Sequence, residues 1–154
     1  MTSRKRIELR LERTIPAAPE ELFDAWLDPT IPGNPWHAAE RLLLDARVDG
    51  LFYWSLKGMA HYGRFTAMDR PRVVTHTWVS PNTLGHESIV TVRFEAQGDA
   101  TRMTLVHSGL PDHEVAHGHQ RGWDYFLGVF GDQFGDGSRK PYRWEEAHPP
   151  TAHD

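Results

Sequence analysis

The stretch DHEVAHGHQRGWDYFLGVFGDQF, residues 112–134, decides the fold. Its large side chains recur every three or four residues, at Val115, His119, Trp123, Phe126, Leu127, Phe130 and Phe134. This spacing predicts one long amphipathic helix whose apolar face packs on the rest of the protein. Asp112 is a suitable N-cap. Four internal glycines (Gly118, Gly122, Gly128 and Gly131) lower the intrinsic helix propensity, so we expect tertiary packing to hold the helix.

The residues before this helix predict a meander of β-strands. Between about residue 40 and residue 108, six segments rich in β-branched and aromatic residues alternate with turns such as Asp49-Gly50 and Lys57-Gly58. Residues 7–15 (IELRLERTI) alternate between apolar and charged side chains, which is typical of a half-buried strand. A short helix beginning at Pro19 follows that strand. This order predicts an α+β helix-grip fold, a curved antiparallel sheet of about seven strands wrapped around the C-terminal helix.

The composition limits the classes of protein. The chain has 154 residues, which fit one domain over residues 1–135, and the polar segment 136–154 is expected to be a flexible tail. The 17 basic residues do not outnumber the 21 acidic ones, so we expect no nucleic-acid partner. There is no cysteine, which excludes disulfides and thiolate metal sites. No segment resembles a signal core or a membrane span, so a cytoplasmic location is expected.

Successive segments of the chain resemble one family, in order over residues 7–134. They are IPAAPEELFDAW, DARVDG, HYGRFTAMDRP, VVTHTW, SIVTVRFE, TRMTLVHSGLPD and HQRGWDYFL. In these segments the chain is similar to the family named after the activator of the heat-shock protein 90 ATPase, within the SRPBCC (START/Bet v 1-like) superfamily. Asp49 departs from the pattern, because the family often has glycine before Gly50. The resemblance implies a helix-grip fold around a mostly apolar cavity, in a superfamily that includes lipid carriers, plant ligand-binding proteins and polyketide aromatases or cyclases.

Strand parity predicts which side chains line such a cavity. With the strands in the expected register, one face carries aromatic rings together with three histidines from separate strands, and Tyr53 and Tyr62 lie on the other face. The helix adds further rings, and Trp26 and Trp36 are expected near the mouth. The predicted ligand cavity comprises Trp36, Phe52, Trp54, His61, Phe65, His76, Trp78, Phe94, Met103, His107, Trp123, Phe126, Leu127 and Phe130. Rings with a few polar groups are typical of small-molecule pockets, although the same rings can simply fill the interior.

The letters HEVAH, residues 113–117, match a zinc-protease motif. The motif falls in the exposed first turn of the predicted helix. His119 lies only two residues after His117, about 200° further around the helix, and so does not face a metal shared by His113 and His117. We therefore interpret the match as coincidence and expect no metal and no other cofactor.

The sequence favours a binding protein over an enzyme. It has no cysteine nucleophile, GxSxG motif or phosphate-binding glycine loop, and Ser88 and Ser108 lie near histidines only in sequence, so no catalytic residue is predicted. We expect a protein that binds a small hydrophobic or aromatic molecule. A cyclase, aromatase or hydrolase that uses the cavity histidines remains an alternative. Another is a co-chaperone that regulates a chaperone ATPase, as the family name implies; a homodimer also stays open.

Overall fold

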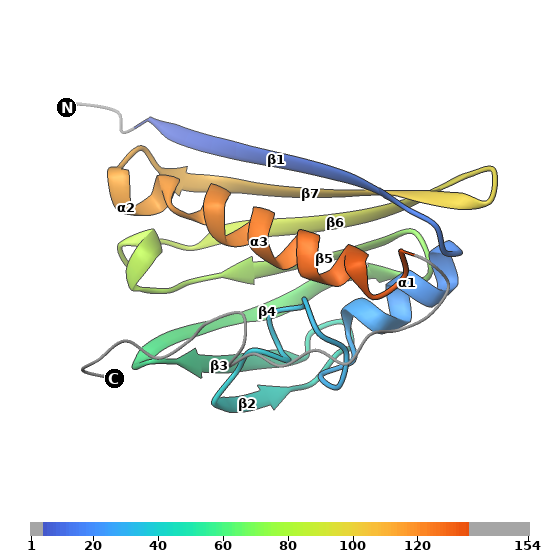
Figure 1. Cartoon of the computed structure of the whole chain (residues 1–154). Helices are drawn as coiled ribbons and strands as arrows, with labels where there is room; N and C mark the ends of the chain where they lie inside the picture. The colour runs from blue at the N-terminus through green and yellow to red at the C-terminus, as the bar shows by residue number, and fades with distance from the viewer. Residues whose placement is uncertain (1–4, 136–154) are drawn as a thin grey trace, which may run out of the picture.

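The computed structural model describes residues 5–135 (Figure 1). The tail predicted over residues 136–154 lies outside the described residues. The elements are β1 (Arg6–Ile15), α1 (Pro19–Trp26), β2 (Arg41–Leu44), β3 (Leu51–Leu56), β4 (Met59–Asp69), β5 (Val73–Trp78), the 3-10 helix η1 (Pro81–Thr83), β6 (Ser88–Gln97), β7 (Ala100–Pro111), α2 (Glu114–His117) and α3 (His119–Asp132).

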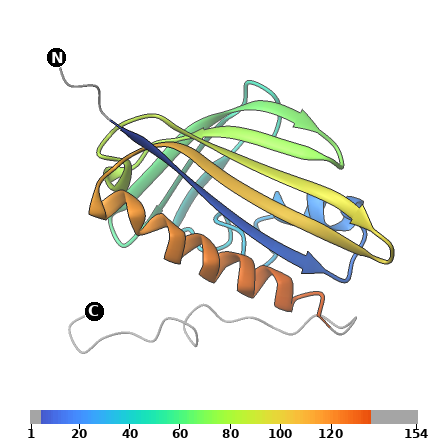
Figure 2. The same cartoon turned by 90° about the horizontal axis from the view of Figure 1, so that it is seen from above.

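The strands form one antiparallel sheet in the order β1-β7-β6-β5-β4-β3-β2. β2 to β7 follow one another as a meander, and β1 joins the far edge by pairing with β7. The sheet curves around α3, which runs across its inner face (Figure 2). The predicted α+β helix-grip fold is therefore confirmed.

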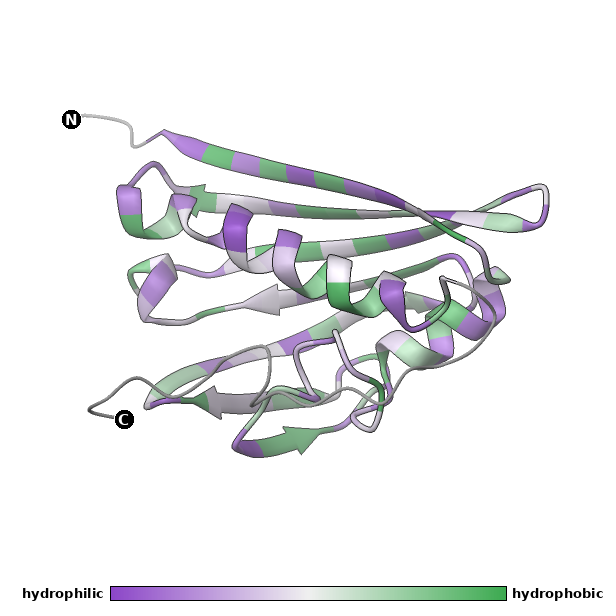
Figure 3. Cartoon of the chain, in the orientation of Figure 1, coloured by the Kyte–Doolittle hydropathy of each residue, from purple (hydrophilic) through white to green (hydrophobic). Residues whose placement is uncertain are grey.

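Alternation along the strands separates core from solvent as predicted. In β1, Leu11 and Ile15 are buried and Glu12 is exposed, and hydrophilic and hydrophobic residues alternate along the ribbon (Figure 3). In β3 to β7 the predicted inner set is buried, including Phe52, Trp54, Phe65, Val74, His76, Trp78, Val90, Val92, Phe94, Met103, Leu105 and His107. The predicted register is correct, because a shift by one residue would have reversed these faces.

The segment after α1 is fastened to that helix and lies against α3. α1 begins at Pro19 with Glu20 and Glu21 in its first turn, as the sequence predicts. The Asn34 side chain donates to the carbonyl oxygens of Ala25 and Asp28, at 2.9 and 2.8 Å, which satisfies acceptors at the end of the helix.

Gly33 gives this segment a very close approach to α3. It has a φ of +100°, and a Cβ there would lie 2.2 Å from the backbone nitrogen of Phe130. A side chain at this position is therefore excluded by space as well as by backbone conformation.

The prediction of one continuous helix over residues 112–134 is wrong in detail. α2 and α3 are separate helices that meet at Gly118, where the backbone amide bonds to the Val115 carbonyl three residues back. The predicted N-cap is also wrong. His113 is the N-cap, because its Nδ1 accepts a hydrogen bond from the Val115 amide at 3.0 Å. Glycine weakens the helix at the break, and an imidazole can accept the amide hydrogen bond that an aspartate usually takes.

Asp49 has a φ of 68°, in the left-handed region. Glycine adopts this region freely, and Asp does so more readily than most residues. This backbone requirement is met by the aspartate here, at a position where the family named in the sequence analysis often has glycine.

Within residues 5–135, no helix combines the length and the apolar character needed to cross a membrane.

Candidate functional site

A pocket of about 130 Å³ lies between the sheet and α3, beside the break at Gly118. We call it the ring pocket, and it is lined by Trp54, His61, Trp78, Asn82, Gly118, His119, Gly122, Trp123 and Phe126. An engineered apolar cavity of about 150 Å³ holds benzene. The ring pocket is therefore large enough for about one small ring.

Glycines on the helix make room for this pocket. Gly118 and Gly122 lie one turn apart, and a Cβ at Gly122 would meet no atom of residues 5–135 within 4 Å apart from the backbone of its own helix. Trp78 of the sheet packs against Trp123 of the same helix with ring centroids 5.1 Å apart, and Phe126, one turn further along α3, lies 6.0 Å from Trp123. The aromatic rings of the pocket thus border two positions of the helix that have no side chain.

His61 stacks on Trp54 at the β3–β4 side of the pocket. The ring centroids are 4.0 Å apart and the planes differ by 8°. His61 is only 8% exposed, and burial, assisted by nearby His119, lowers its pKa to about 4. The ring is therefore neutral at pH 7.

Two nitrogens of this stacked pair are buried without a well-formed hydrogen bond. Neither His61 Nδ1 nor Trp54 Nε1 has such a partner among residues 5–135. An unmade hydrogen bond at a buried polar group costs about 1–3 kcal/mol. Such a group calls for an explanation, and a ligand or a water molecule in the pocket would provide one.

His119, in contrast, has both ring nitrogens occupied. Its Nδ1 lies 2.9 Å from the Ala116 carbonyl oxygen, and its Nε2 accepts from Trp78 Nε1 at 3.3 Å. Because the carbonyl can only accept and the indole can only donate, the neutral ring carries its proton on Nδ1. Burial lowers the pKa of His119, which favours this neutral form.

Ser88 and His107 have the spacing of a nucleophile and its base but the wrong proton arrangement. Ser88 Oγ lies 2.7 Å from His107 Nε2, and Trp123 Nε1 donates to His107 Nδ1 at 2.9 Å. The neutral ring therefore carries its proton on Nε2 and donates to Ser88, whose hydroxyl in turn donates to the Trp78 carbonyl at 2.6 Å. Burial, together with His119 and His76, lowers the pKa of His107 to about 2. The imidazole has no free lone pair with which to take the serine proton.

The ring pocket brings together Trp54, His61, Trp78, Trp123 and Phe126 from the predicted cavity set. The other nine predicted residues are buried in the interior and do not line the pocket: Trp36, Phe52, Phe65, His76, Phe94, Met103, His107, Leu127 and Phe130. Of these, His107 lies directly behind the pocket, hydrogen-bonded to Trp123. Phe52 also borders an open groove of about 740 Å³ on the outer face of the sheet, with Leu43, Leu51 and Tyr62.

Trp36 and Trp26 differ from their predicted place near a cavity mouth. Both are 1% exposed, and Trp36 packs edge-on against Phe52 at 5.0 Å while its Nε1 donates to the Trp26 carbonyl. His76 lies in the same cluster, 5.0 Å from Phe52, and its Nδ1 is 2.9 Å from the Thr77 carbonyl oxygen. Most of the predicted hollow is thus occupied by the rings themselves.

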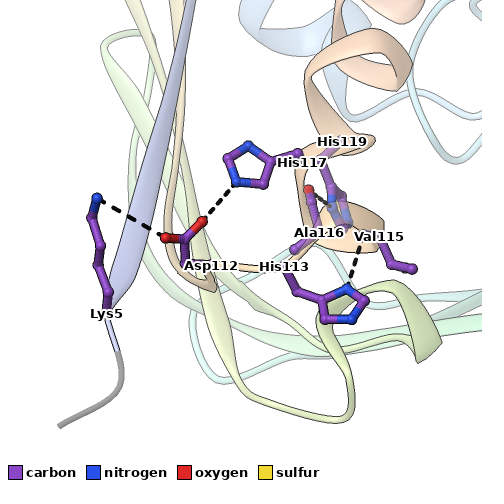
Figure 4. Close-up of polar contacts among 7 residues, drawn as sticks. All are labelled: Lys5, Asp112, His113, Val115, Ala116, His117 and His119. Carbon is purple, nitrogen blue, oxygen red and sulfur yellow. Dashed lines mark hydrogen bonds and ion pairs between the residues drawn. The ribbon is translucent and has the colours of Figure 1, made fainter.

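The HEVAH side chains serve the start of the helix (Figure 4). His113 caps α2, and His117 Nε2 lies 2.9 Å from Asp112 Oδ1. That hydrogen bond lowers the pKa of Asp112, and Lys5 lies 4.0 Å from the same carboxylate. Within the described range, no three His, Asp or Glu side chains converge as metal ligands would.

One known protein family matches the chain over most of these elements. Residues 16–133 match the model of the Activator of Hsp90 ATPase homolog 1-like protein family. The chain belongs to this family. The match spans most of the chain, from the end of β1 to the end of α3. No curated protein sequence matches the chain.

Solved structures similar to this family member share its fold at low sequence identity. Protein MLL2253 from Mesorhizobium loti is 22% identical with a TM-score of 0.70, over 81% of this chain and 94% of that one. An HSP90 activator from Plasmodium falciparum, PFC0360w, is 22% identical with a TM-score of 0.65, over 79% and 91%. The Aha1 dimer from Colwellia psychrerythraea is 14% identical with a TM-score of 0.67, over 85% and 98%.

The predicted cavity set missed four residues that line the ring pocket: Asn82, Gly118, His119 and Gly122. The sequence could have indicated His119 and Gly122, because helical spacing places them on the same face as Trp123 and Phe126. Nothing in the sequence indicated Asn82, since it lies in the short η1 turn and reaches the pocket only through the folding of the chain.

Proposed function

We propose that this protein binds a small hydrophobic or aromatic molecule, one ring of which enters the ring pocket, and that it does so without catalysing a reaction. The observation that carries the proposal is the space of about 130 Å³ between stacked aromatic side chains and the helix glycines. Burying apolar surface there supplies affinity at roughly 25 cal/mol per Å². The family assignment supports the proposal through the helix-grip fold alone.

Gly122→Leu provides the direct test. The new side chain extends into open space that belongs to the pocket, so we expect the variant to fold and to lose binding of toluene or indole by at least about tenfold. Binding is measured by calorimetry or by quenching of tryptophan fluorescence.

Gly128→Leu is the matched control. It places the same side chain on the same helix, at a site where a Cβ also meets no atom within 4 Å and outside the ring-pocket lining. We expect it to bind like the wild type. Equal binding by the wild type and both variants would contradict the proposed site, and so would the absence of wild-type binding.

Hydrolysis by Ser88 and His107 has less support. The pair is buried, and the hydrogen bond from Trp123 occupies the lone pair that a general base requires. Isomerisation or cyclisation by His61 is not favoured either, because a group with a pKa of about 4 is a weak base at neutral pH.

A chaperone regulator is the second candidate. It is favoured by the family match and by the similarity in fold to the Plasmodium falciparum HSP90 activator. This function predicts that the protein raises the ATPase rate of a heat-shock protein 90 chaperone. An unchanged rate at saturating protein would remove it.

A further inference from the structure

We propose that the ring pocket takes a ring bearing a hydroxyl group, as in a phenol, and that His61 is the side chain that hydrogen-bonds this hydroxyl. The inference rests on the proposed function, because it names the chemistry of the molecule that the pocket binds. It goes further by assigning one specificity-determining residue among the four buried or half-buried histidines of the core.

The other three histidines have protein partners that fix their protons. His107 is held between Trp123 and Ser88, and His119 between Trp78 and Ala116. His76 lies in the core with its Nδ1 on the Thr77 carbonyl. The hydrogen bonds of these three rings therefore hold the fold together.

His61 is different because its Nδ1 is buried without a hydrogen-bond partner among residues 5–135, although the backbone of Met59 and of Trp54 raises its pKa slightly against the effect of burial. Its Nδ1 is fully covered, and the side chain lines the ring pocket, so a ligand there is expected to meet the other ring nitrogen, Nε2. A neutral imidazole with free nitrogens adopts either tautomer. A hydroxyl group matches both tautomers, since it can donate to a lone pair or accept from an N–H group.

The surroundings of His61 favour a neutral ligand. Among residues 5–135, the pocket is lined by aromatic rings, two helix glycines and Asn82, with no Lys, Arg, Asp or Glu. A carboxylate or phosphate would enter this space without a counter-charge, at a high cost in desolvation. A ring hydroxyl brings one hydrogen bond and no charge.

Phenol and toluene are the appropriate probes, because they have nearly the same shape and differ in one hydroxyl group. Their affinities are measured by calorimetry for the full chain and for His61→Phe. The phenylalanine keeps a ring on Trp54 and removes both nitrogens. We expect the ratio of phenol affinity to toluene affinity to fall about three- to tenfold in His61→Phe, which is the net worth of one hydrogen bond.

The outcomes separate this inference from the proposed function. If the wild type binds both probes and Gly122→Leu binds neither, the pocket is the site; an unchanged ratio in His61→Phe then overturns the role of His61 alone. If the wild type binds neither probe, both proposals fail.

A second readout uses the wild type alone and does not depend on the folding of a variant. Phenol is expected to shift the imidazole nitrogen resonances of His61 in an NMR titration, and toluene is not. The resonances of His107, which is held on both sides, should stay in place with both probes. Equal shifts of His61 with the two probes would contradict the hydrogen bond.

Discussion

At the scale of single residues, the hydroxyl of Ser88 is expected to stabilise the fold. It accepts from His107 Nε2 and donates to the Trp78 carbonyl, and Ser88 is fully buried. Ser88→Ala leaves these groups without that partner, so we expect the free energy of unfolding to fall by about 1–3 kcal/mol. Urea denaturation measures the change.

Ser108→Ala is the control for this substitution, because Ser108 is a half-buried serine of the adjacent strand. A change within about 0.5 kcal/mol is expected there. A loss of activity in Ser88→Ala, without a loss of stability, on a substrate that the wild type turns over would show instead that Ser88 is catalytic.

At the scale of the elements, the contact between the segment after α1 and the backbone of α3 depends on Gly33. Gly33→Ala is expected to lower the free energy of unfolding by about 1–3 kcal/mol more than Gly58→Ala. Both glycines have positive φ, but a Cβ at Gly58 meets nothing within 4 Å. Comparison of the two variants by urea denaturation therefore separates the close approach to Phe130 from the cost of the backbone conformation. Equal losses would show that the approach is easily relaxed.

The elements also show how far the sequence predicts this structure. Alternation placed Phe52, Trp54, His76 and Trp78 on the inner face, because a strand has only two faces and one of them is buried. The same pattern does not say which rings fill the interior and which border a space. That outcome depends on how rings from different strands pack, as Trp36 does against Phe52.

The helix illustrates the same limit. Its apolar spacing predicted the packing face, with Trp123, Leu127 and Phe130 buried, but did not predict the break at Gly118. Nor did it distinguish His113 from Asp112 as the N-cap, since neighbouring side chains can both accept an amide hydrogen bond. His61 was predicted as a cavity residue, but its lack of a partner is visible only in three dimensions.

At the scale of the whole molecule, the buried histidines make stability depend on pH. Burial lowers the pKa of His61 and of His76 to about 4 and that of His107 to about 2, from 6.5. Below about pH 6.5 these histidines bind protons in the unfolded chain but stay neutral in the folded protein. The contribution is therefore complete above pH 6.5 and is lost as the pH falls toward 4, by up to about 1.4 kcal/mol per pH unit for each histidine.

Urea denaturation at pH 7.5, 6.0 and 5.0 measures this dependence. We expect the midpoint to fall steadily over the series, and to fall less steeply in His61→Phe, which removes one of the four histidines whose pKa is lowered. A midpoint that is unchanged between pH 7.5 and pH 5.0 would mean that these rings are protonated in the folded protein.

The central claim is that the molecule keeps one accessible space among its rings, beside the glycines of the helix. A crystal structure determined under xenon pressure tests it most directly, because xenon enters apolar cavities of this size. We expect a xenon atom among Trp54, Trp78 and Trp123, beside Gly122. A structure in which these side chains close on one another and exclude xenon from that space would contradict it.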